Sequence, residues 1–87
     1  MTIVYGDGYL INYDTIDRLW VGEHNFNGEL FPALCMEIHN KKKVLFFCKD
    51  ASYIQDCFKA IRTAVVHGNS YCELPVTPDD GSKVIWC

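Results

Sequence analysis

The sequence contains no Cys-x-x-Cys pair, no run of about 18 apolar residues and no excess of basic side chains, and each absence removes a class of protein. An odd number of cysteines, five, fits neither a complete disulfide framework nor a zinc ribbon. Met1 to Leu10 has no basic start, so we expect neither a signal peptide nor a membrane span. The net charge of −3 argues against duplex nucleic acid or an anionic membrane as the main partner.

The positions of the cysteines favour buried free thiols. Cys35 and Cys48 lie in apolar runs with strand composition, and Cys57 lies on the apolar stripe of a predicted helix. Free cysteine is among the most buried residue types, and free thiols indicate a reducing compartment, so we expect a cytoplasmic protein. A metal pair at Cys35 and His39 lacks two further ligands, and we therefore expect no metal and no cofactor.

One segment carries a strong helical signal. Apolar residues recur with the spacing of a single helical stripe at Ile54, Cys57, Phe58, Ile61, Ala64 and Val65. Asp50 or Ser52 can cap the start of this helix, and Gly68 can end it, with His67 in the last turn. The pattern predicts one amphipathic helix over residues 51–67.

The rest of the chain has the composition of short strands and turns. Asn27-Gly28 is the strongest hairpin signal, and residues 40–42 predict a second reversal. Pro32 indicates an edge or bulge position. Residues 43–49 are apolar on both faces, which predicts a central, well-covered strand, and Gly6-Asp7-Gly8 predicts a turn between two short strands.

No group of residues carries a catalytic signature. Cysteine and histidine are present, but nothing around them has the pattern of an activated nucleophile and its oriented base. The carboxylate pair Asp79-Asp80 lies in a Pro/Gly turn, where a solvated bend is the ordinary explanation. We expect a non-enzymatic protein without catalytic residues.

Aromatic and basic residues give the best functional hint. The chain has two Trp, five Tyr and five Phe, more than one small core can hide, and exposed Trp and Tyr are typical anchors of protein interfaces. Overfilling of a small core is the alternative explanation. The one basic cluster either contacts an acidic partner or stays solvated and protects a sheet edge. The candidate interaction residues are Trp20, Trp86, Tyr53, Lys41, Lys42 and Lys43.

The layout also resembles a known group of proteins. The segments that carry the resemblance are YLINYDTIDRLWV, FPALCMEIHNKKKVLFFCK, ASYIQDCFKAIRTAVVHG and the closing SYCELP. They resemble a group of very small, mostly uncharacterised proteins of Gram-positive bacteria, their phages and mobile elements, with a minimal pleckstrin-homology-like (PH-like) fold. The resemblance implies a strongly bent antiparallel sheet whose open end is plugged by the helix, and it brings no catalytic or ligand-binding motif.

These observations together predict an α+β fold, a bent antiparallel sheet of about five to seven short strands with one helix. We expect one compact domain over residues 1–75 and a C-terminal extension, 76–87, that adds an edge strand. The expected function is a protein–protein interaction module, encoded by a phage or mobile element, that acts by steric occlusion of a host protein, for example as a defence-system inhibitor. The alternatives are a small-ligand or nucleotide-binding module that uses the mouth of the bent sheet, and a homodimer through an edge strand.

Overall fold

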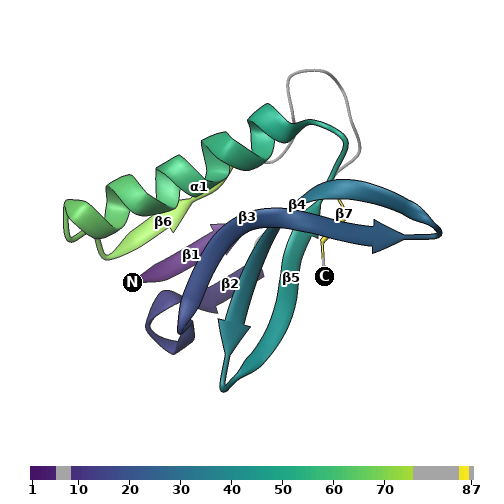
Figure 1. Ribbon diagram of the computed structural model, residues 1–87. Helices are drawn as coiled ribbons and strands as arrows, with labels where there is room; N and C mark the ends of the chain where they lie inside the picture. Colours follow the sequence, from purple (N-terminus) through teal and green to yellow (C-terminus); the bar gives the residue numbers. More distant parts are fainter. Residues whose placement is uncertain (6–8, 76–84, 87) are drawn as a thin grey trace.

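The computed structural model, which describes residues 1–5, 9–75 and 85–86, is an α+β fold in which strands lie along one side of a single long helix (Figure 1). The strands of the described part fall into a three-stranded and a four-stranded sheet. In chain order the elements are β1 (Thr2–Tyr5), β2 (Tyr9–Asn12), the 3₁₀ turn η1 (Tyr13–Thr15), β3 (Arg18–Phe26), β4 (Glu29–Ile38), β5 (Lys41–Phe47), α1 (Ala51–Val66), β6 (Tyr71–Glu73) and β7 (Ile85–Trp86).

The predicted helix is confirmed, and so are its signals at both ends. The Asp50 carboxylate accepts hydrogen bonds from the backbone N–H groups of Ser52 and Tyr53, at 3.0 and 3.3 Å. These bonds satisfy two of the donors that a helix start leaves without an intrahelical partner. His67 is the C-terminal cap, and Gly68 follows it in the left-handed conformation, with φ +67°.

The four-stranded sheet is antiparallel, in the order β3-β4-β5-β7. Asn27 and Gly28 both have positive φ and close the β3–β4 hairpin as predicted. The second reversal lies one residue earlier than the predicted 40–42. His39 and Asn40 form a two-residue loop with φ of +52° and +65°, and Lys41 already begins β5. A two-residue loop with positive φ matches the twist of the flanking strands better than a longer turn.

Pro32 explains where β5 ends, although it lies neither on an edge strand nor at the bulge. β4 has neighbours on both sides, and its register shift falls between Leu34 and Cys35. The Cys48 N–H donates to the Pro32 carbonyl at 3.2 Å. Because proline has no N–H, the return bond of this pair cannot form, and the ladder stops. The chain then turns toward α1.

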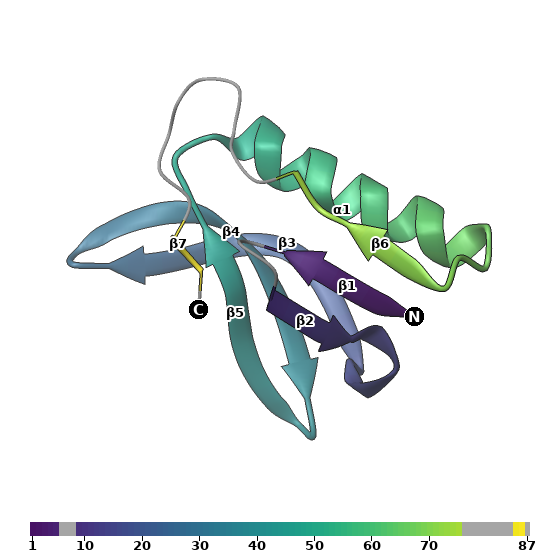
Figure 2. The same cartoon turned by 180° about the vertical axis from the view of Figure 1, so that it is seen from behind.

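The expectation of a single bent antiparallel sheet is wrong. β1 pairs with β2 antiparallel and with β6 parallel, which makes a separate three-stranded sheet in the order β2-β1-β6 (Figure 2). The break between the sheets is at η1, where the Asn12 side chain accepts from the Asp14 N–H at 3.0 Å and ends β2. β1 takes β6 as its second partner, and β6 returns beside the helix.

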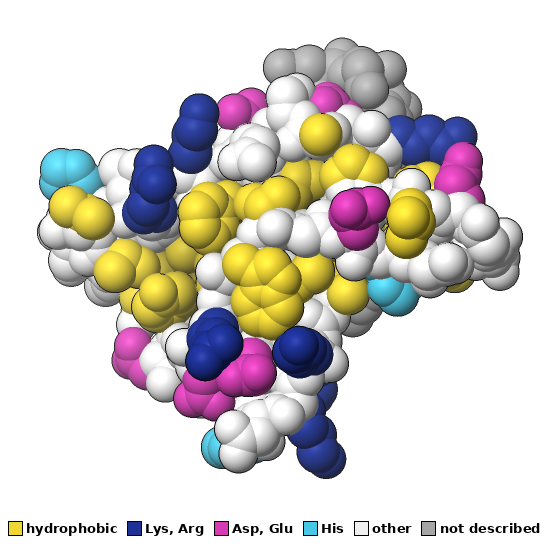
Figure 3. Space-filling model, viewed as in Figure 1, with side chains coloured by type: hydrophobic (Ala, Val, Ile, Leu, Met, Phe, Trp, Pro, Cys, Tyr) yellow, Lys and Arg dark blue, Asp and Glu magenta, His cyan; other side chains and the backbone are white. Residues whose placement is uncertain are grey.

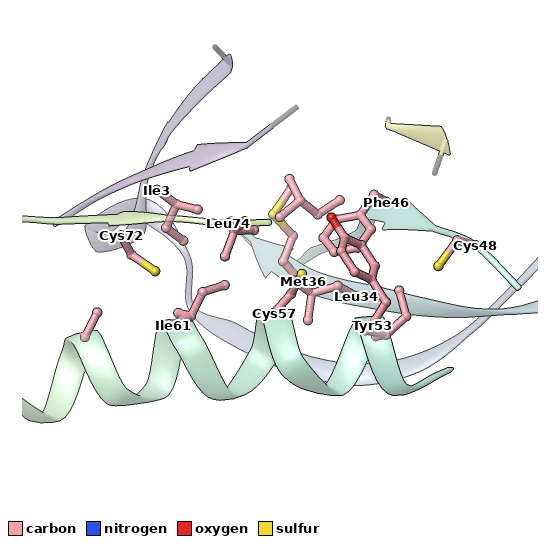
Figure 4. Close-up of a cluster of buried hydrophobic side chains, with 13 residues drawn as sticks. Ile3, Leu34, Met36, Phe46, Cys48, Tyr53, Cys57, Ile61, Cys72 and Leu74 are labelled. Carbon is pink, nitrogen blue, oxygen red and sulfur yellow. The ribbon is translucent and has the colours of Figure 1, made fainter. Parts of the chain in front are cut away.

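One core joins both sheets to α1. Tyr53, Cys57 and Ile61 point from the helix toward β1, β6 and the four-stranded sheet (Figure 4). The side chains that they contact are almost fully buried, with exposed fractions of at most 7%. The buried members of this core are Ile3, Leu34, Met36, Leu45, Phe46, Cys48, Tyr53, Ile54, Cys57, Ile61, Ala64, Cys72 and Leu74.

Candidate functional site

The four-stranded sheet is apolar on both faces, and α1 covers only one of them. Strand alternation sends Leu34 and Met36 toward the helix, and Ala33 and Cys35 toward the opposite side. On that opposite side, Ala33, Cys35 and Phe47 form a second buried cluster. We call this side the outer face; its residues are Trp20, His24, Phe26, Phe31, Ala33, Cys35, Val44 and Phe47.

Three rings close over Phe47 on the outer face. The ring centroids of His24, Phe26 and Phe31 lie 4.7, 5.2 and 5.4 Å from that of Phe47, all at tilted angles. Such offset arrangements are the favoured geometry for aromatic pairs. Phe47 is therefore only 1% exposed, while Phe26 above it keeps 41% of its surface open to solvent. The rings form a packed layer in which Phe26 is exposed and His24 and Phe31 are partly buried.

Trp20 is held at the other end of the outer face by a close approach to Gly22. A methyl group at Gly22 would lie 3.1 Å from the Cys35 Sγ and 3.2 Å from the Trp20 Nε1. A side chain at this position would push the indole or the sulfur outward by a few tenths of an ångström. Trp20 itself is half-buried, and its indole N–H has no hydrogen-bond partner among the described residues.

A pocket of about 720 Å³ opens beside Trp20. Its lining is mostly apolar, with a few polar side chains at the margin, as is common for sites that hold a side chain or a small molecule. A second hollow of about 500 Å³ adjoins it and shares Trp20 and Lys42. The first pocket is lined by Trp20, Glu23, His24, Cys35, Met36, Lys42, Lys43 and Val44.

Basic side chains lie around the pocket, and two of them form no ion pair with a described residue. Lys42 and Lys43 are exposed and form no ion pair within the described ranges. Arg18, in the adjoining hollow, lies 3.8 Å from the Glu37 carboxylate, measured between Nε and Oε1. In the view of Figure 3, apolar side chains gather across the middle of the molecule, and basic and acidic side chains meet at their lower margin, toward the β4–β5 hairpin.

The structure brings together three of the candidate interaction residues named from the sequence. Trp20, Lys42 and Lys43 line the same pocket, although they come from β3 and β5. Lys41 is exposed at the start of β5, where it pairs with Ile38, and does not line that pocket. Trp86 contributes its backbone to β7, opposite Phe46, and its side chain lies outside the described part.

Tyr53 is the clearest departure from the expected site. Its side chain is only 4% exposed and packs edge-on against Phe46, with 5.8 Å between the ring centroids. Its hydroxyl group donates a hydrogen bond to the Pro75 carbonyl. Burial of the phenol also raises its pKa above the ordinary value. Tyr53 therefore links α1 to the end of β6 and is not offered to a partner.

Sequence reasoning did not select His24, Phe26 or Phe31 for the site. A signal was present, because every second residue from Trp20 to Phe26 is aromatic, histidine or glycine, and period two places them on one face. The hairpin at Asn27-Gly28 then fixes Phe31 opposite His24. The alternation could have identified the outer face once that hairpin had been placed.

The buried thiols are poorly suited to nucleophilic chemistry. Cys35, Cys57 and Cys72 are free and buried, as expected, and Cys48 is buried as well; Cys87 lies outside the described residues. Burial raises the pKa of Cys57 to about 12 and also raises the pKa of Cys35 and of Cys72. Because the thiolate is the nucleophile, such groups are inert near neutral pH.

Two kinds of site are absent from the described residues, a cluster of metal ligands and a membrane-spanning helix. No three His, Cys, Asp or Glu side chains of residues 1–5, 9–75 and 85–86 come together as a set of metal ligands. Over the same ranges no helix combines the length and the apolar character needed to cross a bilayer. The turn predicted at Gly6-Asp7-Gly8 and the Asp79-Asp80 bend lie outside the described part.

Comparison with known proteins adds no relative. No protein-family model, no curated protein and no solved structure matches this chain. The outer face and its pocket are therefore the basis on which a function can be argued.

Proposed function

We propose that this chain is a non-enzymatic protein-binding module whose contact surface is the outer face of the four-stranded sheet. The observation that carries the proposal is the second apolar cluster, on the side of the sheet that α1 leaves uncovered. The packed aromatic layer leaves Phe26 41% exposed and lies beside a half-buried tryptophan. This composition is typical of the centre of an interface, where most of the binding energy arises. Binding would act by steric occlusion of the partner.

The placement of polar groups supports the same surface. Interfaces have an apolar centre and a polar margin, and here Lys42 lies beside the Trp20 pocket, on the same face of the sheet as Trp20. Trp20 offers both a large apolar ring and an indole N–H without a described partner, which suits an anchor that is buried on binding. We propose further that the partner is a protein of a bacterial host and that the chain comes from a phage or mobile element of the PH-like group.

The proposal is tested by capturing partners from a bacterial lysate with the immobilised wild-type chain and with Trp20→Ala. A protein that the wild type retains in stoichiometric amount should not be retained by Trp20→Ala, or its affinity should fall at least about tenfold. The reason is that an interface tryptophan often contributes about 2 kcal/mol to binding. Thermal melting of the variant separates loss of contact from loss of fold.

Tyr71→Ala is the matched control, since Tyr71 is 60% exposed but lies on β6, away from the outer face. It should bind as the wild type does. A second variant at the face, Phe26→Ser, removes an exposed ring at the hairpin end of β3 and should also weaken binding. Equal binding by the wild type, Trp20→Ala and Phe26→Ser would contradict the assigned surface.

The pocket volume favours one second candidate, a small-ligand or nucleotide-binding module. About 720 Å³ falls in the range typical of ligand sites, and the lining is apolar with a few convergent polar groups. A thermal-shift screen of nucleotides and aromatic carboxylates tests this function. A ligand that raises the melting temperature of the wild type but not of Trp20→Ala would favour it over the protein-binding function.

A further inference from the structure

We propose that the partner segment bound at the outer face is acidic and inserts one bulky apolar side chain into the Trp20 pocket. This inference rests on the proposed function and names the chemistry of the partner.

The shape and the apolar lining of the pocket suit an inserted side chain. The Trp20 ring and the buried Cys35 present apolar surface, and Val44 lies beside them on the next strand. Anchor residues of interfaces fill such partly preformed pockets and contribute most of the binding energy. The volume of about 720 Å³ accommodates a large aliphatic or aromatic side chain together with the backbone on either side of it.

The hydrogen-bonding groups at the pocket are mainly donors. The Trp20 indole N–H has no described partner, and the ammonium group of Lys42, which lies on the same face of the sheet, can only donate. Glu23 supplies the one carboxylate of the lining, and the His24 ring is packed on Phe47. An occupant that satisfies these groups must therefore bring acceptors, and carboxylates are the strongest acceptors among protein side chains.

The local charge is opposite in sign to that of the whole chain. On the face of the sheet that carries Trp20, the strand register places two cations at the two adjoining hollows, Arg18 and Lys42, against the single carboxylate of Glu37, whereas the chain carries a net charge of −3. A positive margin favours encounter with an acidic segment and disfavours a basic one.

The same charge argues against a second copy of this chain as the occupant. In a two-fold symmetric dimer the same surface meets itself, so a contact centred on Trp20 would bring the Arg18 and Lys42 side chains of both copies toward each other. Like charges brought together at an interface are destabilising. A separate protein segment that carries Asp or Glu has no such conflict.

The experiment uses a random peptide library displayed on phage as the probe, selected against the full wild-type chain. We expect enriched peptides to combine a large apolar residue with nearby Asp or Glu. Their affinity should fall at least about fivefold with Lys42→Glu/Lys43→Glu, because the favourable charge contact of Lys42 becomes repulsive. Raising the ionic strength from about 0.05 M to about 0.5 M should also weaken the binding of these peptides.

Lys59→Glu/Arg62→Glu is the matched control, with two charge reversals at exposed positions of α1. It should bind the selected peptides as the wild type does. If the Lys42/Lys43 reversal does not fold, Lys42→Gln/Lys43→Gln replaces it, with a smaller loss expected.

The outcomes separate this inference from the proposed function. Loss of peptide binding with Trp20→Ala but not with the lysine reversal would overturn the acidic partner and keep the surface. Peptides insensitive to both sets of variants would overturn the surface as well. The inference would also be overturned if the enriched peptides were neutral or basic, or if no peptide were enriched. It would be overturned as well if sedimentation showed that the wild-type chain is a dimer and that Trp20→Ala converts it to a monomer.

Discussion

Gly22 controls how closely Trp20 and Cys35 approach the backbone of β3. A methyl group there would lie 3.1 Å from the Cys35 sulfur and 3.2 Å from the Trp20 indole nitrogen, tighter than ordinary van der Waals contact. Elsewhere in a strand, alanine would be at least as favourable as glycine, since glycine has the greater conformational entropy to lose. The absence of a side chain at this position is therefore best explained by the packing of the outer face.

We predict that Gly22→Ala displaces the Trp20 indole and lowers the free energy of unfolding by about 1 kcal/mol, because an added methyl group overpacks a filled site. The affinity of peptides for the Trp20 pocket should also fall in this variant. The measurement is the tryptophan fluorescence maximum in a Trp86→Phe background, together with chemical denaturation. Gly22→Ala/Cys35→Ala makes room on the sulfur side and should recover part of the lost stability; an unshifted emission maximum in Gly22→Ala would contradict the packing role.

At the scale of elements, α1 is the part whose ends are defined most locally. The Asp50 carboxylate accepts two backbone N–H bonds and also the Ser52 hydroxyl, the last at 2.7 Å between Oγ and Oδ1. These bonds hold the first turn directly after β5, where the chain changes from strand to helix. The helix can then present its apolar stripe to both sheets.

We predict that Asp50→Ala lowers the free energy of unfolding by about 1 kcal/mol, since it removes the acceptor for two helix-start donors. Urea denaturation followed by circular dichroism measures the change. Ser52→Ala is the control, because it removes the hydroxyl but keeps the capping carboxylate, and it should cost clearly less. Equal losses for the two variants would show that the cap is not the source of the effect.

Elements with local signals could be predicted from the sequence, whereas their pairing could not. Asp50, Gly68 and the Asn27-Gly28 pair act through bonds and dihedral angles within a few residues, and each was confirmed. The parallel pairing of β1 with β6 joins segments about 70 residues apart, and no local pattern specifies such a partner. The same reason explains why one bent sheet was expected and two were found.

The candidate site shows the same limit. Trp20 and the lysines were each selected for their chemistry, but their meeting depends on the register of β3 on β4 and of β4 on β5. Tyr53 was selected because tyrosine is common at interfaces. It directly precedes Ile54, however, and lies with it on the buried side of α1. Residue type indicated the chemistry, and only the fold decided which side chains could reach a partner.

Across the whole molecule, the four-stranded sheet separates two apolar layers with different neighbours. One layer packs against α1 and the three-stranded sheet, and the other is closed only by its own aromatic rings in the described part. Phe46 and Phe47, adjacent in β5, enter one layer each and are 0% and 1% exposed. This pair permits a matched comparison, because the residue type, the strand and the degree of burial are the same.

We predict that Phe46→Leu and Phe47→Leu both lower the free energy of unfolding, by about 1–3 kcal/mol, because each removes buried ring contacts. Their effects on binding should differ. Phe47→Leu withdraws the ring on which His24, Phe26 and Phe31 pack, and should weaken peptide or partner binding at least about threefold. Phe46→Leu alters the helix side alone and should bind normally wherever it remains folded. Calorimetric titration at a temperature well below both melting transitions makes the comparison, and equal binding losses would indicate that the two layers do not act separately.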